Sequence, residues 1–404
     1  MNIRRTPVKP MRILASVTII MLFILLATVF NTDGVNVKQT RHTDPITKIE
    51  DITVDEIQDQ TAPIGIRKQY TFTLEDNISQ DISLAFYTVH QYVTVWIDGK
   101  EVYSINPSAD KRITKTVASI WVMIPLYSAD SGKKVDVQIT PVYESFRNRK
   151  IEFLTGSSEA IFQDRLLKDL PQLVLGGMAV LTGIVFLCIA ICGILRKKHM
   201  SGLSWMGIFS VMIGIWRLTD TRSTPFMDFG RPVFIYYINL TLLMLGLLPL
   251  LQWTKMYFNK TGRKVIEIYE TAALVFAMLQ FILQYFKVID IRETMTVTHI
   301  VMGIGMICLV AVVVYEIKCE QGLSTNSKIK FPLEIKLAFI CVAGIFLDII
   351  AFYIKGNSSG FIFTLLTFLI YIICMGILSI QRYNQQQAEL AQQNRTGSTG
   401  TETY

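Results

Sequence analysis

The chain has 404 residues, of which 51% are hydrophobic and only 18% are charged, and its mean hydropathy is +0.40. So few polar side chains do not cover the apolar surface of a soluble protein, and the composition therefore predicts a membrane protein that lipid partly covers. The formal net charge of +7 does not indicate nucleic-acid binding, because the basic residues cluster in short loops beside apolar runs, as membrane insertion and anionic lipid favour.

The first apolar run, Ile13–Phe30, follows a basic segment, residues 1–12, that is expected in the cytoplasm. The run is longer than the core of a usual signal peptide and ends without an Ala-x-Ala cleavage site. An uncleaved transmembrane anchor is therefore favoured over a cleaved signal peptide. Under either alternative, the segment that follows is exported.

Residues 31–156 are predicted to form an extracellular all-β sandwich. Apolar and polar side chains alternate along Tyr70–Leu74 and Val135–Ile139, which is the period of a half-buried strand. The pair Asp98–Gly99 predicts a tight hairpin, because both residues tolerate a positive φ angle. None of the six cysteines lies in this segment, so the domain must fold without disulfides. Further strand-like runs are Ile82–Thr88, Tyr92–Ile97, Ser119–Leu126 and Lys150–Leu154.

Three aromatic residues of this domain are candidates for ligand binding, namely Tyr92, Trp96 and Trp121. Each lies on the strand face opposite the aliphatic side chains of its own run. If the aliphatic faces form the core, the three rings lie on an outer face or near a rim, where they could stack on a sugar or another amphipathic ligand. The alternative is that they fill a second core layer or pack under a loop.

Arg147, Arg149 and Lys150 form a basic patch near the end of the domain. This patch either binds an anion or is a solvated charged turn. Residues 157–171 then have the pattern of a short amphipathic connector, which would carry any movement of the domain into the membrane.

Residues 172–380 contain seven further apolar runs with short connections, each close to the length that crosses a bilayer. A single run could be a buried soluble helix, but seven in succession predict a seven-helix membrane domain. With the anchor, the fold class is a bundle of one plus seven transmembrane helices that carries an extracellular β-domain. The runs are Gln172–Leu195, Leu203–Thr219, Val233–Trp253, Val265–Phe286, Met295–Ile317, Leu337–Ile354 and Phe361–Ile380.

The loops on one side of this bundle carry more Lys and Arg than those on the other, which predicts that both termini are cytoplasmic in a plasma-membrane protein. The basic loops contain Arg196, Lys197, Lys198, Lys255, Lys260, Arg263, Lys264, Lys318, Lys328, Lys330 and Lys336.

Charged residues within or beside the spans are candidates for coupling, because charge in hydrocarbon is costly. Asp348 lies within its span, while Arg217 and Asp220 lie where Leu203–Thr219 leaves the membrane. We expect a polar cluster near the outer surface, in which Asp348 pairs with Arg217 if their helices are neighbours. The alternative for the arginine is snorkelling to the interface.

The sequence lacks the motifs of common catalytic sites, including the P-loop, His-Glu-x-x-His and Gly-x-Ser-x-Gly. Its four histidines are scattered: His42, His90, His199 and His299. We therefore expect no enzyme activity, no cofactor and no metal site.

The layout resembles the bacterial seven-transmembrane receptors with diverse intracellular signalling modules, over about residues 11 to 383. The supporting stretches are the connector from Glu159 to Pro171, Gly214–Asp220 and Leu247–Leu250, and the hairpin Val95–Val102 resembles strands of galactose-binding-type sandwiches. The resemblance implies an extracellular jelly-roll sensor, seven helices, a cytoplasmic output domain and a carbohydrate-like ligand.

The end of the chain departs from that family, whose members usually end in an output domain such as a kinase or a GGDEF cyclase. Residues 381–404 are a tail in which Gln385–Asn394 has the composition of the start of a signalling helix and Thr396–Tyr404 that of a disordered segment. Either the output domain is missing or a partner supplies the output.

The sequence therefore predicts a transmembrane signalling receptor. Its expected partners are the lipid bilayer, a small extracellular ligand such as a sugar, and a cytoplasmic signalling protein or a second copy of the chain. The alternatives are a membrane transporter or transport accessory protein, which would usually show an internal repeat and paired broken helices, and a purely structural envelope protein.

Overall fold

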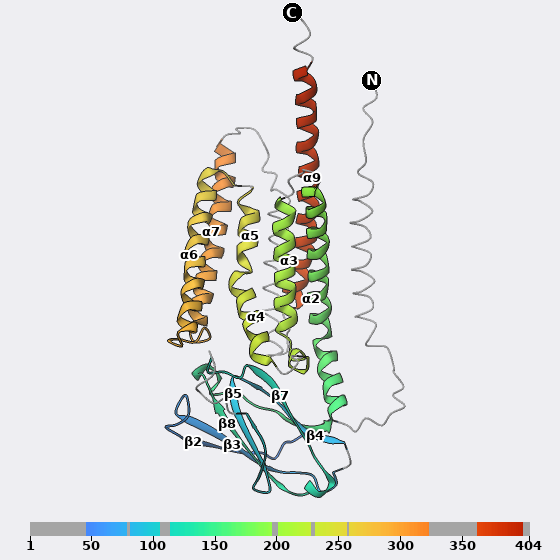
Figure 1. The fold of residues 1–404 in the computed structure, drawn as a ribbon, viewed down its shortest axis with the longest axis vertical. Helices are drawn as coiled ribbons and strands as arrows, with labels where there is room; N and C mark the ends of the chain where they lie inside the picture. The colour runs from blue at the N-terminus through green and yellow to red at the C-terminus, as the bar shows by residue number, and fades with distance from the viewer. Residues whose placement is uncertain are drawn as a thin grey trace, which may run out of the picture.

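The computed structural model describes residues 46–78, 81–105, 114–195, 201–227, 231–256, 258–322 and 362–398. In these residues a β-rich domain lies at one end of a group of long helices (Figure 1). The predicted anchor Ile13–Phe30 and the predicted span Leu337–Ile354, which contains Asp348, lie outside the described residues.

The β-domain, residues 46–157, consists of two antiparallel sheets with the strand orders β1-β9-β4-β7 and β2-β3-β8-β5-β6. The chain passes from one sheet to the other repeatedly, so neighbours in each sheet are mostly distant in sequence. The strands are β1 Thr47–Lys48, β2 Thr53–Gln58, β3 Ile66–Thr73, β4 Ile82–Val89, β5 Gln91–Ile97, β6 Lys100–Ile105, β7 Ser119–Pro125, β8 Lys134–Pro141 and β9 Phe153–Ser157.

One hydrophobic core fills the space between the two sheets. Phe153 on β9 is fully buried, and its ring centre lies 4.9 Å from that of Phe86 in its own sheet. Tyr70 and Phe72 reach it from the other sheet, at 5.4 and 5.1 Å. Alternate residues of the strands supply the rest of this core, as the period-two pattern predicts.

The hairpin predicted at Asp98–Gly99 is confirmed between β5 and β6. The two residues have φ angles of 50° and 76°, which are the left-handed angles that a two-residue primed turn requires. Glycine adopts this conformation freely, whereas most other residues there are strained.

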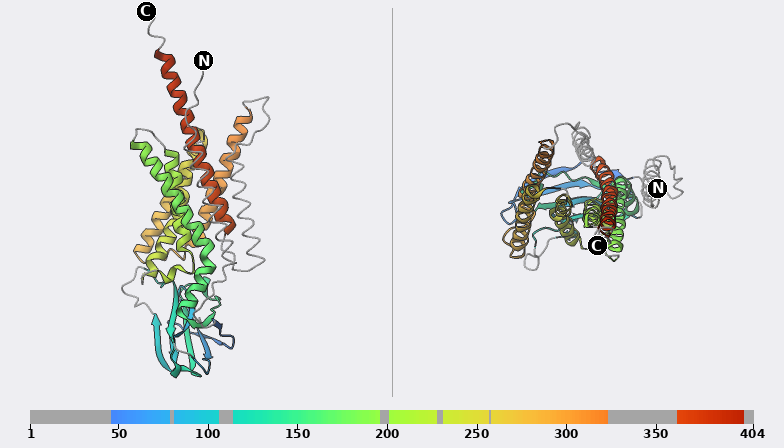
Figure 2. Two further views of the ribbon diagram at one scale, coloured as in Figure 1. Left: turned by 90° about the vertical axis from the view of Figure 1, so that its right-hand side faces the viewer. Right: turned by 90° about the horizontal axis from the view of Figure 1, so that it is seen from above.

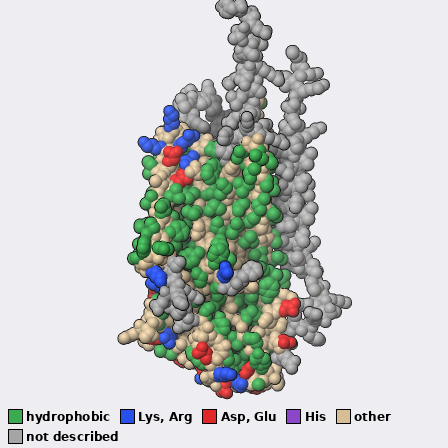
Figure 3. Space-filling view, in the orientation of Figure 1, with side chains coloured by type: hydrophobic (Ala, Val, Ile, Leu, Met, Phe, Trp, Pro, Cys, Tyr) green, Lys and Arg blue, Asp and Glu red, His purple; other side chains and the backbone are tan. Residues whose placement is uncertain are grey.

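Five helical segments are long and apolar enough to cross a membrane: Ser158–Leu195, Gly202–Thr219, Pro232–Thr254, Lys260–Tyr285 and Met295–Tyr315. Their outer surface is largely hydrophobic, and charged side chains gather toward the two ends (Figure 3). The helices are α2 Ser158–Leu195, α3 Ser201–Thr219, α4 Pro232–Leu245, α5 Leu247–Thr254, α6 Lys260–Tyr285, α7 Met295–Gly322 and α9 Ile362–Ser398.

The predicted span Val233–Trp253 is divided into α4 and α5. Pro249 has no amide hydrogen, so it does not donate the helical hydrogen bond to the carbonyl of Leu245, and its ring crowds that carbonyl. The helix is interrupted at Gly246, one turn before the proline.

Helix α9 also continues further than the sequence indicated, because it extends to Ser398 and beyond the ends of the other helices (Figure 1). Thr396–Ser398, predicted to be disordered, are therefore helical.

The segment predicted as a separate connector is the beginning of α2. Strand β9 ends at Ser157 and the helix begins at the next residue, so no loop separates sheet and helix. The Ser157 hydroxyl oxygen accepts a hydrogen bond from the amide of Ala160, which is the usual cap of a helix start. The helix then runs through Pro171 without a break.

Helices α2 and α3 pack backbone against backbone. A Cβ atom at Gly183 would lie 2.7 Å from the carbonyl oxygen of Gly207, and one at Gly214 would lie 2.7 Å from that of Gly176. The Ser210 hydroxyl donates to the carbonyl of Ala179 at 2.6 Å. Small residues permit such close approach between helices in lipid.

The other helices divide into two sides. Helix α9 packs on α2 and α3, while Leu251 of α5, Ile266 and Tyr269 of α6 and Val312 of α7 form a separate cluster. Seen from above, α6 and α7 lie on one side of the bundle and α2 and α9 on the other (Figure 2).

Candidate functional site

The candidate site is the junction where the β-domain meets the near ends of the helices. It contains two contacts that we name by their chemistry. The polar contact joins residues 114–116, just before β7, to the turn between α6 and α7. The aromatic contact joins the outer face of β7 to α2 and to the segment after α3.

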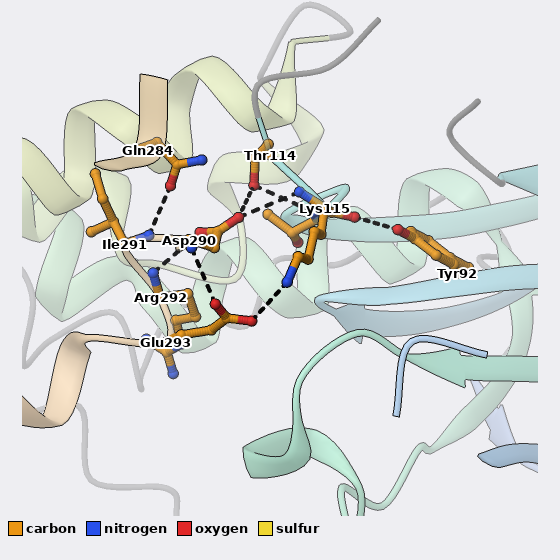
Figure 4. Close-up of polar contacts among 9 residues, drawn as sticks. Tyr92, Thr114, Lys115, Gln284, Asp290, Ile291, Arg292 and Glu293 are labelled. Atoms are coloured by element: carbon orange, nitrogen blue, oxygen red, sulfur yellow. Dashed lines mark hydrogen bonds and ion pairs between the residues drawn. The ribbon is translucent and has the colours of Figure 1, made fainter. Parts of the chain in front are cut away.

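Asp290 is the centre of the polar contact (Figure 4). Only 3% of its surface is exposed, and its carboxylate accepts hydrogen bonds from the Thr114 hydroxyl at 2.5 Å and the Lys115 amide at 3.3 Å. The Lys115 ammonium forms an ion pair with Glu293 at 3.0 Å. The Tyr92 hydroxyl donates to the carbonyl of Lys115, so the same short segment is held from the β-domain side as well.

The turn that carries Asp290 is organised by its own hydrogen bonds. The Asp290 amide donates to the Glu293 carboxylate at 3.1 Å, and the Arg292 amide donates to the Asp290 carboxylate at 3.2 Å. This exchange resembles the capping box that precedes many helices. The Ile291 amide donates to the side-chain oxygen of Gln284 at 2.7 Å. The hydrogen bonds of the α6–α7 turn therefore fix the position of Asp290 independently of its contact with the β-domain.

His90 lies beside the polar contact and is almost fully buried. Its Nδ1 atom lies 2.6 Å from the Thr116 hydroxyl, and its ring packs edge-on against Tyr143, Phe146 and, from α4, Tyr236. The pKa of His90 is lowered to about 3. Burial is the main cause, and the positive charges of Arg292 and Arg149 contribute the rest. The imidazole is therefore neutral at physiological pH.

Trp121 is the centre of the aromatic contact. Its ring stacks on Phe226 with centroids 5.2 Å apart, and its indole nitrogen donates to the carbonyl of Arg222 at 2.9 Å. The guanidinium of Arg165, from the first turns of α2, lies 5.4 Å from the Trp121 ring centre. Cation–π attraction and apolar packing both stabilise this arrangement.

Asp169 ties α2 to the segment after α3. Its carboxylate accepts hydrogen bonds from the amide and the hydroxyl of Ser223, both at 2.7 Å. The start of α2, the segment after α3 and strand β7 therefore hold one another in place.

The structure does not bring the predicted ligand-binding residues together. Tyr92 and Trp96 lie on β5, whereas Trp121 lies on β7 in the opposite sheet. Trp121 and Tyr92 take part in the junction, while Trp96 lies next to the Asp98–Gly99 hairpin and is half-buried.

Two of the three predicted coupling residues, Arg217 and Asp220, contact each other. Arg217 is buried, and its guanidinium pairs with the carboxylate of Asp220, one turn away, at 2.9 Å. Because Asp348 lies outside the described residues, its pairing with Arg217 stays a prediction.

A second candidate is a groove at the edge of the β-domain, with a volume of about 510 Å³. It lies between β1, the segment that links β1 to β2, and the end of β3. Its lining combines threonines, charged residues and apolar residues, and consists of Lys48, Ile49, Glu50, Asp51, Thr53, Thr71, Phe72, Thr73, Leu74, Glu75 and Thr155.

Sequence reasoning missed the polar contact and the groove. The spacing of Asp290 and Glu293 is a signal for a capped turn. The sequence around it does not indicate that Asp290 binds Thr114, which is 176 residues away. Within the described ranges, no group of three or more His, Cys, Asp or Glu side chains is placed to hold a metal ion.

Comparison with known proteins gives no relative: no protein-family model, no curated protein and no solved structure matches the chain significantly.

Proposed function

We propose that the chain is a transmembrane signalling receptor whose β-domain senses an extracellular ligand and whose helices carry the resulting change to a cytoplasmic partner. The observation that carries this proposal is the double attachment of the β-domain. It is covalently continuous with α2, and it is held non-covalently to the α6–α7 turn by buried polar groups.

The attachment to α2 transmits a movement of the β-domain directly to the helix, because no loop lies between them. Strand β9 pairs with both β1 and β4, and the next residue after it begins a 38-residue helix. A change in the sheet therefore moves the near end of α2 directly, because a continuous helix resists bending far more than a loop does.

The attachment to α6–α7 can open and close. Undocking would leave Asp290 and Thr114 to bind water, whereas docking removes them from water and pairs them. Such contacts have two discrete arrangements of similar free energy, which a receptor needs if its ligand is to shift a population. A ligand that alters the relation between the two sheets would bias this equilibrium.

The groove of the β-domain supports a polar, carbohydrate-like ligand. Its volume lies within the range of small-molecule sites, and a lining that mixes threonines and carboxylates with apolar residues suits a polyhydroxylated molecule. The alternation of the strands between two sheets supports a jelly-roll assignment for the domain.

Cross-linking tests whether the polar contact communicates with the far ends of the helices. Lys115 and Glu293, whose charged ends meet at 3.0 Å, are replaced by cysteine in a background without native cysteines. The two cysteines are joined by a reducible bifunctional maleimide that spans the length of the two lost side chains, because a direct disulfide needs a closer approach of the backbones. The pair Lys48 and Glu152, 3.3 Å apart within the β-domain, gives a matched control. Hydrogen exchange is then compared between linked and reduced protein.

We expect the Lys115–Glu293 link to alter exchange in residues 258–265 at the far end of α6, and the control link to leave it unchanged. Equal exchange in both linked proteins would contradict the receptor proposal. Uptake of a sugar into vesicles containing the chain would favour the transporter alternative.

A further inference from the structure

The structure separates the basic patch near the end of the β-domain into residues with different surroundings. Arg147 pairs with Glu56 at 2.7 Å and with Glu144 at 3.4 Å, and Lys150 is exposed. Arg149 is half-buried instead, and its guanidinium carbon lies 5.8 Å from the ring centre of Tyr87 on β4. Arg149 therefore belongs to the junction and not to the solvated turn beside it.

A second arginine reaches the same ring from the helical part. The guanidinium carbon of Arg222, an exposed residue of the segment after α3, lies 5.7 Å from the ring centre of Tyr87. The junction thus gathers two positive charges that come from distant parts of the chain around a single aromatic side chain.

Neither guanidinium has a carboxylate partner among the ion pairs of the described residues. Asp220, two residues before Arg222, pairs with Arg217. Burial lowers the pKa of Arg149; the nearby Tyr87 raises it, and the charge of Arg222 lowers it again. Both guanidinium carbons lie less than 6 Å from the same ring centre, at 5.8 and 5.7 Å, and an anion that both groups reach would offset the repulsion between their charges.

We propose that Arg149 and Arg222 bind a phosphate-type oxyanion at the junction. Guanidinium groups match the geometry of phosphate oxygens and can hold them by two parallel hydrogen bonds each. Arg222 follows the end of α3 by three residues, so the site lies at the level where lipid headgroups would surround the helices. The oxyanion is therefore the headgroup phosphate of an anionic lipid or a free phosphate. This inference does not depend on the receptor proposal.

Thermal unfolding of the full chain tests the site. Protein in micelles of an uncharged maltoside detergent, which carries no phosphate, is titrated with inorganic phosphate against chloride at constant ionic strength. A second preparation in the same detergent, without free phosphate, contains phosphatidylglycerol. The double variant combines Arg149→Gln and Arg222→Gln. The matched control is Arg147→Gln, because Arg147 already has two carboxylate partners.

We expect phosphate, phosphatidylglycerol or both to raise the unfolding temperature of the native chain and of Arg147→Gln. The apparent affinity should fall at least about tenfold in the double variant, since hydrogen bonds between a guanidinium and an oxyanion are stronger than neutral ones. Without either anion, the double variant should be as stable as the native chain or more stable, because its charges no longer repel. Stabilisation by the lipid alone would assign the site to a headgroup, and stabilisation by free phosphate would assign it to a soluble anion.

Equal responses of the native chain and the double variant to both anions would overturn the proposal. Should the double variant fail to fold, Arg149→Lys and Arg222→Lys keep the charges and the stems but lose the paired hydrogen bonds. Those variants should bind phosphate more weakly than the native chain, and unchanged binding in both would equally overturn the proposal.

Discussion

The α2–α3 pair and the α6–α7 hairpin are both antiparallel helix pairs that touch the junction, but they are held together by different forces. Gly183 and Gly214 let the backbones of α2 and α3 meet, so this pair fits in one arrangement only. In the hairpin, the α7 glycine Gly305 faces a side chain and not a backbone, namely the ring of Tyr269, whose hydroxyl donates to the carbonyl of Val301 at 3.1 Å.

The hairpin is instead fixed to its surroundings by polar groups at both ends. Asp290 binds the β-domain at one end, and Glu270 pairs with Lys255 of the α5 end at 2.6 Å toward the other. Between them, the side-chain nitrogen of Gln280 donates to Thr294 at 2.6 Å and to Thr298 at 2.9 Å. Steric fit is rigid, whereas polar pairs can exchange partners, so we expect movement in the hairpin and not in the α2–α3 pair.

The largest effect is expected from the Lys255–Glu270 pair, because the side chains are only 12% and 9% exposed. Replacing Glu270 by Ala leaves a buried ammonium without its partner and should cost about 3–5 kcal/mol of stability. Replacing Lys255 by Met as well should restore part of that loss. Thermal unfolding of both single variants and of the double variant measures the coupling; additive losses would show that the pair does not hold α6.

The next effect is expected at the polar contact. Asp290→Ala removes the acceptor of Thr114 and Lys115 and should weaken docking by about 1–3 kcal/mol. The control is Glu293→Gln, whose ion pair with Lys115 is exposed and should contribute less than about 1 kcal/mol. Hydrogen exchange at residues 114–118 reports docking, and equal exchange in the two variants would refute the central role of Asp290.

A smaller effect is expected in the α2–α3 pair, and it sharpens the contrast with the hairpin. Gly183→Ala would press a Cβ atom against the backbone of α3 and should cost about 1–3 kcal/mol. The matched control is Gly177→Ala on the same helix, where nothing lies within 4 Å of the added atom. Because alanine favours a helix over glycine, the control should be neutral or stabilising in thermal unfolding. A loss as large in Gly177→Ala would rule out tight backbone packing as the cause.

Near neutral pH the smallest effect is a pH dependence at the junction, because it develops only as the pH falls below 6.5. The pKa of His90 is about 3 in the folded protein, below its ordinary value of 6.5, so the unfolded or undocked chain binds a proton that the docked chain does not. Docking should therefore be full above pH 6.5 and weaken as the pH falls toward 3, by at most about 1.4 kcal/mol per pH unit. Hydrogen exchange at residues 114–118 measured from pH 7 to pH 5 should show this.

His90→Asn serves as the control for that pH dependence. The residue has a φ angle of 56°, which asparagine tolerates, so the backbone is kept while the titrating group is lost. A variant that retains the full pH dependence would assign it to another group.

Several features of this protein were determined by the sequence alone because they depend on neighbours along the chain. Alternation of polarity marked the strands, five of the eight long apolar runs correspond to membrane-length helices of the described residues, and Asp98–Gly99 marked a hairpin with positive φ angles. These patterns act over two to four residues, or over the thickness of a bilayer, and need no knowledge of the fold.

What each face of an element packs against, and which distant residues meet, follow instead from the packing of the β-domain against the helices. The periodicity of β7 placed Trp121 outside the core, but whether that outer face meets a ligand or a helix depends on the packing of α2 and Phe226 against it. Thr114 and Asp290 are far apart in sequence, as are Arg149 and Arg222 beside Tyr87. No local pattern encodes such pairs, because their free energy arises only when the β-domain and the helices have already been brought together.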